Sequence, residues 1–207
     1  MKLLELAVRT LCDVKAGKVA DAVFLYSQTI DNQNSVLSAA CRLIADNLAK
    51  KIIITHSGPK SGYPGYPVWR RALLDRGMSA ESIMGIDLDE AESLNTLIEA
   101  NAMIEFARKR RYTDIYISAA PFHQLRAFMT SITAALNHYP QIKIYSYSGM
   151  ALPWLENVAH SQGETQGPRR ELIHAEFARI VKYQNKGDLA GDDTVLDYLD
   201  ARDRFRS

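Results

Sequence analysis

The stretch that decides the fold runs from AVFLY at residues 22–26 to IIIT at residues 52–55. Both runs are short and apolar, and they are rich in β-branched or aromatic residues, as in strands that are buried on both faces of a sheet. Between them, residues 35–49 carry apolar side chains at helical spacing. A helix between two buried strands predicts a β–α–β unit with parallel strands.

The same alternation continues toward the C-terminus. The pattern predicts helices at 68–76, 93–110 and 122–137, and strands at 83–86, 114–118 and 142–145. Because crossovers between parallel strands are right-handed, we expect a three-layer, Rossmann-like α/β fold with five parallel strands in the order 3-2-1-4-5. The binding crevice should then open between the first and fourth strands.

Flanking segments surround this core, which spans residues 21–148. An amphipathic helix is predicted at 3–14. From residue 149 on, glycine and proline interrupt a polar connection with no clear strand, so we expect a loop or lid. Two more helices are predicted at 169–184 and 193–204. A chain of 207 residues is typical of one core, so residues 1–207 are predicted to form a single domain with N- and C-terminal helices flanking the sheet.

The composition restricts the class of protein. With 47% hydrophobic and 24% charged residues, the chain is typical of soluble globular proteins. Its formal net charge of +1 argues against a nucleic-acid binder that relies on bulk phosphate neutralisation. Cys12 and Cys41 match no disulfide or metal-binding pattern, and no apolar run reaches the roughly 18 residues that span a bilayer. We expect a cytoplasmic protein without a membrane span, whose oligomeric state the sequence leaves open.

Polar residues follow the ends of the predicted strands, where open parallel sheets bind their ligands. Ser27 and Gln28 follow the first strand, Ser57 and Gly58 follow the second, and Ser118 ends the fourth. The segment after Gly58 is rich in glycine and proline, and its amides could cradle an anion, but it matches no phosphate-loop motif. This segment can be interpreted either as a loop that binds a ligand or as a connection rich in turns.

A second group of candidates lies on the helix predicted at 93–110. Asn95, Thr96 and Glu99 share one face there and can make several hydrogen bonds to one ligand. Asp89 with Glu92 forms a D-x-x-E capping box, and Ser93 is itself a good N-cap residue, but only one of them can cap the helix. Either cap would leave Asn95 and Thr96 unexplained by capping. Capping and ligand binding therefore remain alternatives for this segment.

His123 and Arg126 form a third group in the first turns of the helix predicted at 122–137, after Pro121. A histidine here can act as acid, base or hydrogen-bond donor, and an arginine can hold a carboxylate or phosphate with two parallel hydrogen bonds. Because the neighbouring strand ends feed one crevice, we expect Glu99 to pair with Arg126 when the site is empty. No metal is expected, since no two His or Cys residues stand at ligand spacing.

Two motifs after the β–α–β start resemble the YdcF-like family, also called the SanA–ElyC family, a group with a domain of unknown function. They are S-x-N-T-x-x-E at residues 93–99 and H-x-x-R-A at residues 123–127. The likeness extends from about residue 21 to residue 145. The chain departs from the family pattern at Ser27-Gln28, where the family has a glycine pair, and at Pro59, after which the family's acidic residue is missing.

The resemblance implies a Rossmann-like fold with a polar cleft. It also implies binding of S-adenosylmethionine or a similar nucleotide in one branch of the family, and envelope-precursor metabolism in another. The envelope branch carries a membrane anchor, so we expect this chain to follow the branch that binds small molecules.

Three functions stay open at this point. The first is a soluble protein that binds an adenosyl, nucleotide or other phosphorylated ligand at the strand-end cleft, with His123 as the catalytic residue if it is a group-transfer enzyme. The second is a hydrolase or transferase acting on a phosphorylated lipid or sugar carrier, with His123 and Arg126 on the phosphate. The third is a non-catalytic scaffold whose C-terminal helices bind a partner.

Overall fold

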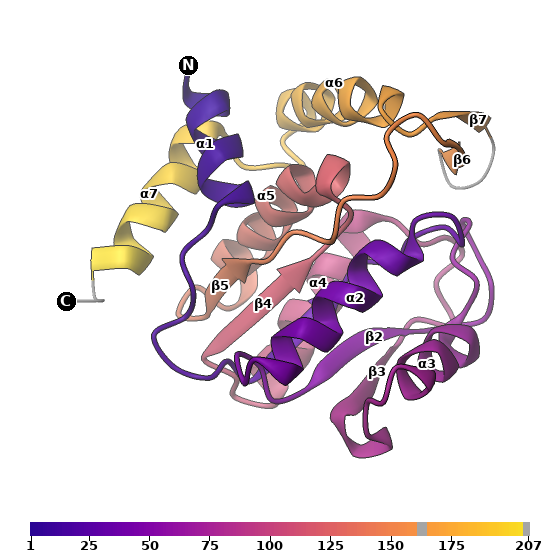
Figure 1. Cartoon of the computed structure of the whole chain (residues 1–207). Helices are drawn as coiled ribbons and strands as arrows, with labels where there is room; N and C mark the ends of the chain where they lie inside the picture. Colours follow the sequence, from indigo (N-terminus) through magenta and orange to yellow (C-terminus); the bar gives the residue numbers. More distant parts are fainter. Residues whose placement is uncertain (161–164, 205–207) are drawn as a thin grey trace.

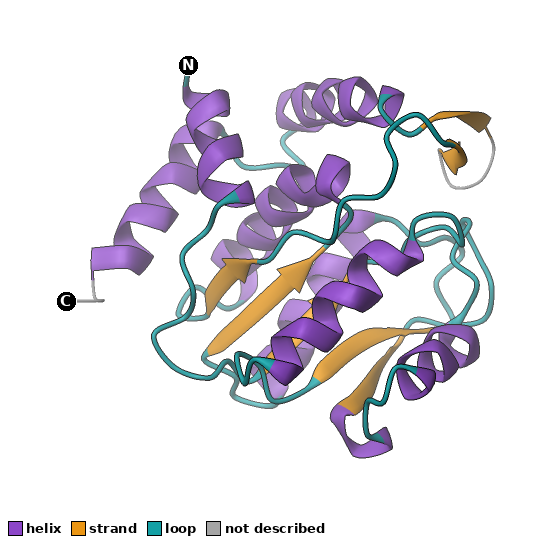
Figure 2. Cartoon of the chain, viewed as in Figure 1, coloured by secondary structure: helices purple, strands orange, loops and turns teal. Residues whose placement is uncertain are grey.

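The computed structural model describes residues 1–160 and 165–204. Its centre is a five-stranded sheet in the order β3-β2-β1-β4-β5, in which every neighbouring pair is parallel (Figures 1 and 2). The strands are β1 (Ala22–Leu25), β2 (Ile52–His56), β3 (Ile83–Asp87), β4 (Asp114–Ser118) and β5 (Lys143–Ser146). The predicted α/β fold and strand order are therefore confirmed.

Helices cover both faces of this sheet and complete three layers (Figure 1). They are α1 (Lys2–Leu11), α2 (Gln33–Ala45), α3 (Tyr66–Asp75), the short 3₁₀ helix η1 (Ala80–Ser82), α4 (Thr96–Lys109), α5 (Pro121–His138), α6 (Glu171–Lys186) and α7 (Asp192–Arg204). Successive side chains of a strand point to opposite faces. Val23 accordingly packs with α2 and α3, whereas Phe24 packs with α4 and α5.

The helices near both ends of the chain pack outside α5 rather than forming a core of their own. Leu6 of α1, Ile180 of α6 and Leu199 of α7 belong to the same buried cluster as the α5 side of the sheet. Helix α1 ends at Leu11, three residues earlier than predicted. None of the helices in the described part of the chain is both long and apolar enough to cross a membrane.

Residues 149–168 are not a strandless connection, contrary to the prediction. Within them, β6 (Asn157–His160) and β7 (Thr165–Pro168) form a two-stranded antiparallel ribbon (Figure 2). The sequence did not indicate β7 because Gly167 and Pro168 are poor strand formers. An edge pairing tolerates them, since only one side of the strand needs hydrogen bonds.

A buried arginine fastens this ribbon to the loop that follows β1. Arg169 is 2% exposed, and its guanidinium donates to Asn32 Oδ1 (2.8 Å) and to the backbone oxygens of Asp31 and Pro153. It also pairs with Glu156 (2.8 Å). These contacts set the path of the chain into α6, which lies with the ribbon beyond the carboxyl ends of the strands (Figure 1).

Candidate functional site

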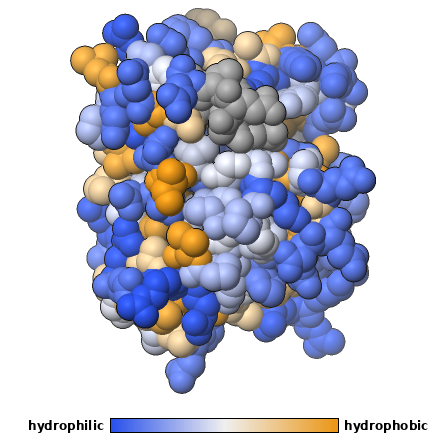
Figure 3. Space-filling view, turned by 90° about the vertical axis from the view of Figure 1, so that its right-hand side faces the viewer, coloured by the Kyte–Doolittle hydropathy of each residue, from blue (hydrophilic) through white to orange (hydrophobic). Residues whose placement is uncertain are grey.

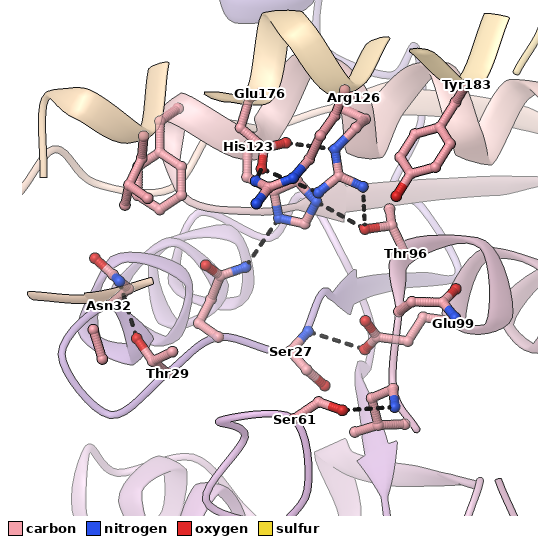
Figure 4. A pocket seen from close by; sticks show the side chains of 17 residues that line it. Ser27, Thr29, Asn32, Ser61, Thr96, Glu99, His123, Arg126, Glu176 and Tyr183 are labelled. Atoms are coloured by element: carbon pink, nitrogen blue, oxygen red, sulfur yellow. Dashed lines mark hydrogen bonds and ion pairs between the residues drawn. The ribbon is translucent and has the colours of Figure 1, made fainter. Parts of the chain in front are cut away.

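A cavity of about 350 Å³ lies at the carboxyl end of the sheet, beneath α6 and β6 (Figure 4). Its walls come from the loop after β1, the first turns of α4 and α5, and one face of α6. The lining residues are Ser27, Gln28, Thr29, Asn32, Ser61, Leu94, Asn95, Thr96, Glu99, Phe122, His123, Arg126, Ala159, Leu172, Glu176, Arg179 and Tyr183. The cavity thus adjoins β1 and β4, the adjacent strands between which the crevice was predicted.

Most of the predicted site residues meet in this cavity. Those that line it are Ser27, Gln28, Asn95, Thr96, Glu99, His123 and Arg126. They come from three separate segments of the chain, which the strand order brings together. The residues from the Ser93–Glu99 and His123–Arg126 motifs therefore share one site, apart from Ser93.

The other predicted residues lie outside the lining of the cavity. Ser57 Oγ donates to the backbone oxygen of Gly58 (3.0 Å), and the Gly58 amide donates to Asp89 Oδ1 (2.9 Å), so this amide is not available to an anion. Ser93 is exposed. Ser118 is fully buried, and its hydroxyl has no hydrogen-bond partner among the described residues.

Helix α4 is capped by Asn95 and not by Ser93, which corrects the sequence interpretation. Asn95 Oδ1 accepts from the backbone amides of Leu97 (3.1 Å) and Ile98 (3.0 Å). The amide of Leu94 donates to Ser61 Oγ (3.0 Å), which ties it to the neighbouring loop, so the helix starts only after this residue. The cap places the first turn of α4, and with it Thr96, against the cavity.

His123 is held as a neutral ring by hydrogen bonds to both nitrogens. Gln28 Nε2 lies 3.3 Å from Nδ1 and also donates to the backbone oxygen of Tyr26 (3.3 Å), so Nδ1 accepts. The proton therefore sits on Nε2, which lies 3.1 Å from Thr96 Oγ1. Burial, with the nearby charge of Arg126, lowers the pKa of His123 to about 3. Of the roles predicted for His123, this geometry supports the hydrogen-bond donor.

The sequence predicted that Arg126 pairs with Glu99, but in the structure it pairs with Glu176 of α6. Its Nε donates to Glu176 Oε2 (2.5 Å), its Nη2 to Glu176 Oε1 (3.2 Å) and its Nη1 to Thr96 Oγ1 (2.7 Å). A guanidinium has five N–H groups. Acceptors from the described residues therefore account for three of them, and two remain for a ligand of the cavity that Arg126 lines.

Glu176 is shared by two arginines. Arg179, one turn along α6, donates to Glu176 Oε1 (2.5 Å). Burial by itself would raise the pKa of Glu176, but the charge and hydrogen bonds of Arg126, with Arg179 contributing, lower it to about 2. One carboxylate thus accepts hydrogen bonds from two guanidinium groups.

Glu99 points toward the β1 side of the cavity, where two donors hold it. Its Oε1 accepts from the backbone amide of Ser27 (3.0 Å) and from Thr55 Oγ1 (2.8 Å). Glu99 is 3% exposed, and burial raises the pKa of its carboxyl. These donors explain why Glu99 does not reach across to Arg126.

Sequence reasoning missed the contribution of α6, namely Glu176, Arg179 and Tyr183. The only local signal was Glu176 with Arg179 at i, i+3, which is typical of a solvent-exposed helix pair. Their position over the cavity depends on the path of the preceding ribbon, which the pattern had not indicated.

No family model matches the chain, and a search of curated proteins finds no similar sequence. The resemblance to the YdcF-like family therefore stays a prediction. Within the described ranges, no group of three or more His, Cys, Asp or Glu side chains is arranged to hold a metal ion.

Proposed function

We propose that the cavity binds a small phosphorylated molecule of the nucleotide or adenosyl class that the sequence suggests. The observation that carries this proposal is the guanidinium of Arg126. Acceptors among the described residues use three of its N–H groups and leave two for a ligand of the cavity. Unused charged donors at a cavity favour an anion.

Two helix N-termini add to this preference. Helices α4 and α5 both begin at the cavity, which their first-turn residues Thr96 and Phe122 line. The N-terminal end of a helix carries partial positive charge, which favours a nearby anion even where the first amides are already bonded, as those of Leu97 and Ile98 are to Asn95 Oδ1. Pro121 at the start of α5 sacrifices no helical hydrogen bond, since the first amides of a helix are unpaired in any case.

The size of the cavity favours a compact ligand. About 350 Å³ lies near the lower end of the roughly 300–1,000 Å³ that is typical of ligand sites. A mononucleotide or a small phosphate ester suits this volume better than a phosphorylated lipid carrier does. The face drawn in Figure 3 is mainly hydrophilic, with small separate hydrophobic groups.

Calorimetry with a mononucleotide, inorganic phosphate and S-adenosylmethionine tests the proposal. We expect the mononucleotide to bind, and Arg126→Lys to weaken that binding by about 1–3 kcal/mol, because lysine cannot donate two parallel hydrogen bonds. Arg71→Lys is the matched control, since Arg71 is exposed and its ion pair among the described residues is with Asp75 of its own helix. Absence of binding by every phosphorylated or adenosyl ligand, or equal affinity in Arg126→Lys and wild type, would contradict the proposal.

A further inference from the structure

Two carboxyl groups line the same cavity in opposite electrostatic states. Glu176 is ionised by its two arginines, which hold its pKa low. Glu99 is almost fully buried, and it forms no ion pair with any residue in the described part of the chain. Leaving a buried carboxyl without a cation is costly, and two carboxyls whose environments separate their pKa values are typical of sites that transfer protons.

The hydrogen bonds of Glu99 fix which oxygen can carry a proton. Oε1 accepts from the Ser27 amide and from the Thr55 hydroxyl, both held by the sheet. A proton on this carboxyl therefore resides on Oε2. Ser27 lies beside it in the same wall, opposite His123 and Arg126 (Figure 4). Its hydroxyl is buried and lies close enough to the Glu99 carboxyl to favour the ionised form.

The other titratable groups around Glu99 do not compete with it for a proton. Tyr26, directly after β1, and Tyr63, in the loop before α3, both have pKa values raised by burial, so they stay protonated. His123 of α5 stays neutral because its pKa is low. Of these groups, Glu99 is the one whose carboxyl pKa is raised toward the protonated form, so it can exchange a proton with a ligand in the cavity.

We infer that Glu99 is a catalytic residue that protonates the leaving oxygen when a small phosphate monoester, bound in the cavity, is hydrolysed. This inference rests on the proposed function. Arg126 and Arg179 would hold the phosphate at one wall, and Glu99 would face the ester oxygen from the opposite wall. The cavity would then be the active site of a phosphate monoester hydrolase.

The step balances with water as the second reactant. The water oxygen forms a bond to phosphorus while the bond from phosphorus to the ester oxygen breaks. The electron pair of the broken bond stays on the ester oxygen, which takes the proton from Glu99 Oε2. The attacking water returns a proton to Glu99, and the products are the alcohol and hydrogen phosphate. Removing such an acid costs about 100- to 10,000-fold in rate.

Glu99→Gln separates this role from ligand binding. The amide oxygen can still accept from Ser27 and Thr55, so the wall of the cavity is kept, but the side chain no longer supplies an acidic proton. We expect kcat for phosphate release from a panel of small monoesters to fall about 100-fold or more, with the calorimetric Kd within a few-fold of wild type. Glu105→Gln, an exposed position on the same helix paired with Arg108, is the control and should match wild type.

Thr55→Val tests the role of Glu99 through the pH–rate profile, which would not shift if Glu99 had only a structural role. The Thr55 hydroxyl favours the ionised carboxyl, so its loss should raise the pKa of Glu99 further and move the falling limb of the pH–rate profile to higher pH. Tight ligand binding without hydrolysis, unchanged kcat in Glu99→Gln, or an unmoved profile in Thr55→Val would overturn the inference and leave the proposed function intact. Absence of ligand binding by wild type would instead overturn the proposed function.

Discussion

Arg202 and Arg126 each bind a carboxylate where an outer helix packs. They differ in how many of their N–H groups have an acceptor. All five N–H groups of Arg202 on α7 have acceptors: both oxygens of Asp13, both oxygens of Asp203 and the backbone oxygen of Ile144. Its guanidinium also lies 4.6 Å from the ring centroid of Tyr145. Acceptors among the described residues account for only three N–H groups of Arg126.

The difference lies in the surroundings rather than in the residue types. Asp13 pairs with Arg202 alone among the ion pairs of the described chain, whereas Glu176 is divided between Arg126 and Arg179. The Arg202 cluster is closed, because Asp13, Asp203 and one backbone oxygen accept from all its N–H groups. The Arg126 cluster borders a cavity and leaves two N–H groups of Arg126 without an acceptor among the described residues. We therefore interpret the Arg202 pair as structural and the Arg126 cluster as a binding site.

Breaking the closed pair should have the largest effect on stability. Arg202→Leu leaves Asp13, whose side chain is 3% exposed, as a buried carboxylate without a cation. We expect the free energy of unfolding to fall by about 3–5 kcal/mol, measured by urea denaturation, with the mononucleotide Kd unchanged. Arg9→Leu is the control, because Arg9 pairs with Asp200 across the same two helices at the surface, and should cost less than about 1 kcal/mol. Equal losses in the two variants would refute the structural interpretation.

Removing the negative charge of Glu176 should have a smaller effect on stability, and this effect should depend on pH. Glu176→Gln keeps a hydrogen-bond acceptor but removes the negative charge. We therefore expect the free energy of unfolding to fall by about 1–3 kcal/mol at pH 7. The folded-state pKa of about 2 lies below the usual 4.5. The contribution of Glu176 is therefore complete above pH 4.5 and is lost as pH falls toward 2.

Urea denaturation at several pH values checks this expectation. The stability gap between wild type and Glu176→Gln should close as pH falls from about 4.5 toward 2. A gap that stays constant over this range would show that Glu176 does not titrate with a lowered pKa.

The sequence predicted the sheet and much of the site because both depend on local patterns. The strands are short apolar runs, and right-handed crossovers restrict their order. Once the order is known, the residues after β1 and at the starts of α4 and α5 must meet at one edge. This is why Ser27, Thr96 and His123 were found from their positions alone.

What could not be predicted depends on long-range contacts. Glu176 reaches the cavity only because Arg169 fastens the ribbon before α6 to the loop that follows β1. No local pattern specifies such a contact. The cap of α4 is a similar case, since Asn95 and Ser93 are both good caps and the contact of Leu94 with Ser61 decides between them.

The last and smallest effect expected is the absence of a titration at His123. A protonated His123 beside Arg126 and Arg179 would add a positive charge to this cluster. Since burial and Arg126 lower the pKa of His123 to about 3, the ring nitrogen signals in ¹H–¹⁵N spectra should keep the neutral, Nε2-protonated pattern from pH 8 to pH 5. His123→Gln identifies the signals. By linkage, the unfolded chain takes up this proton first, so wild type should lose stability relative to His123→Gln as pH falls below about 6.5. A ring that titrates near its usual 6.5 would contradict the neutral assignment. It would mean that His123 adds a positive charge beside Arg126 below that pH.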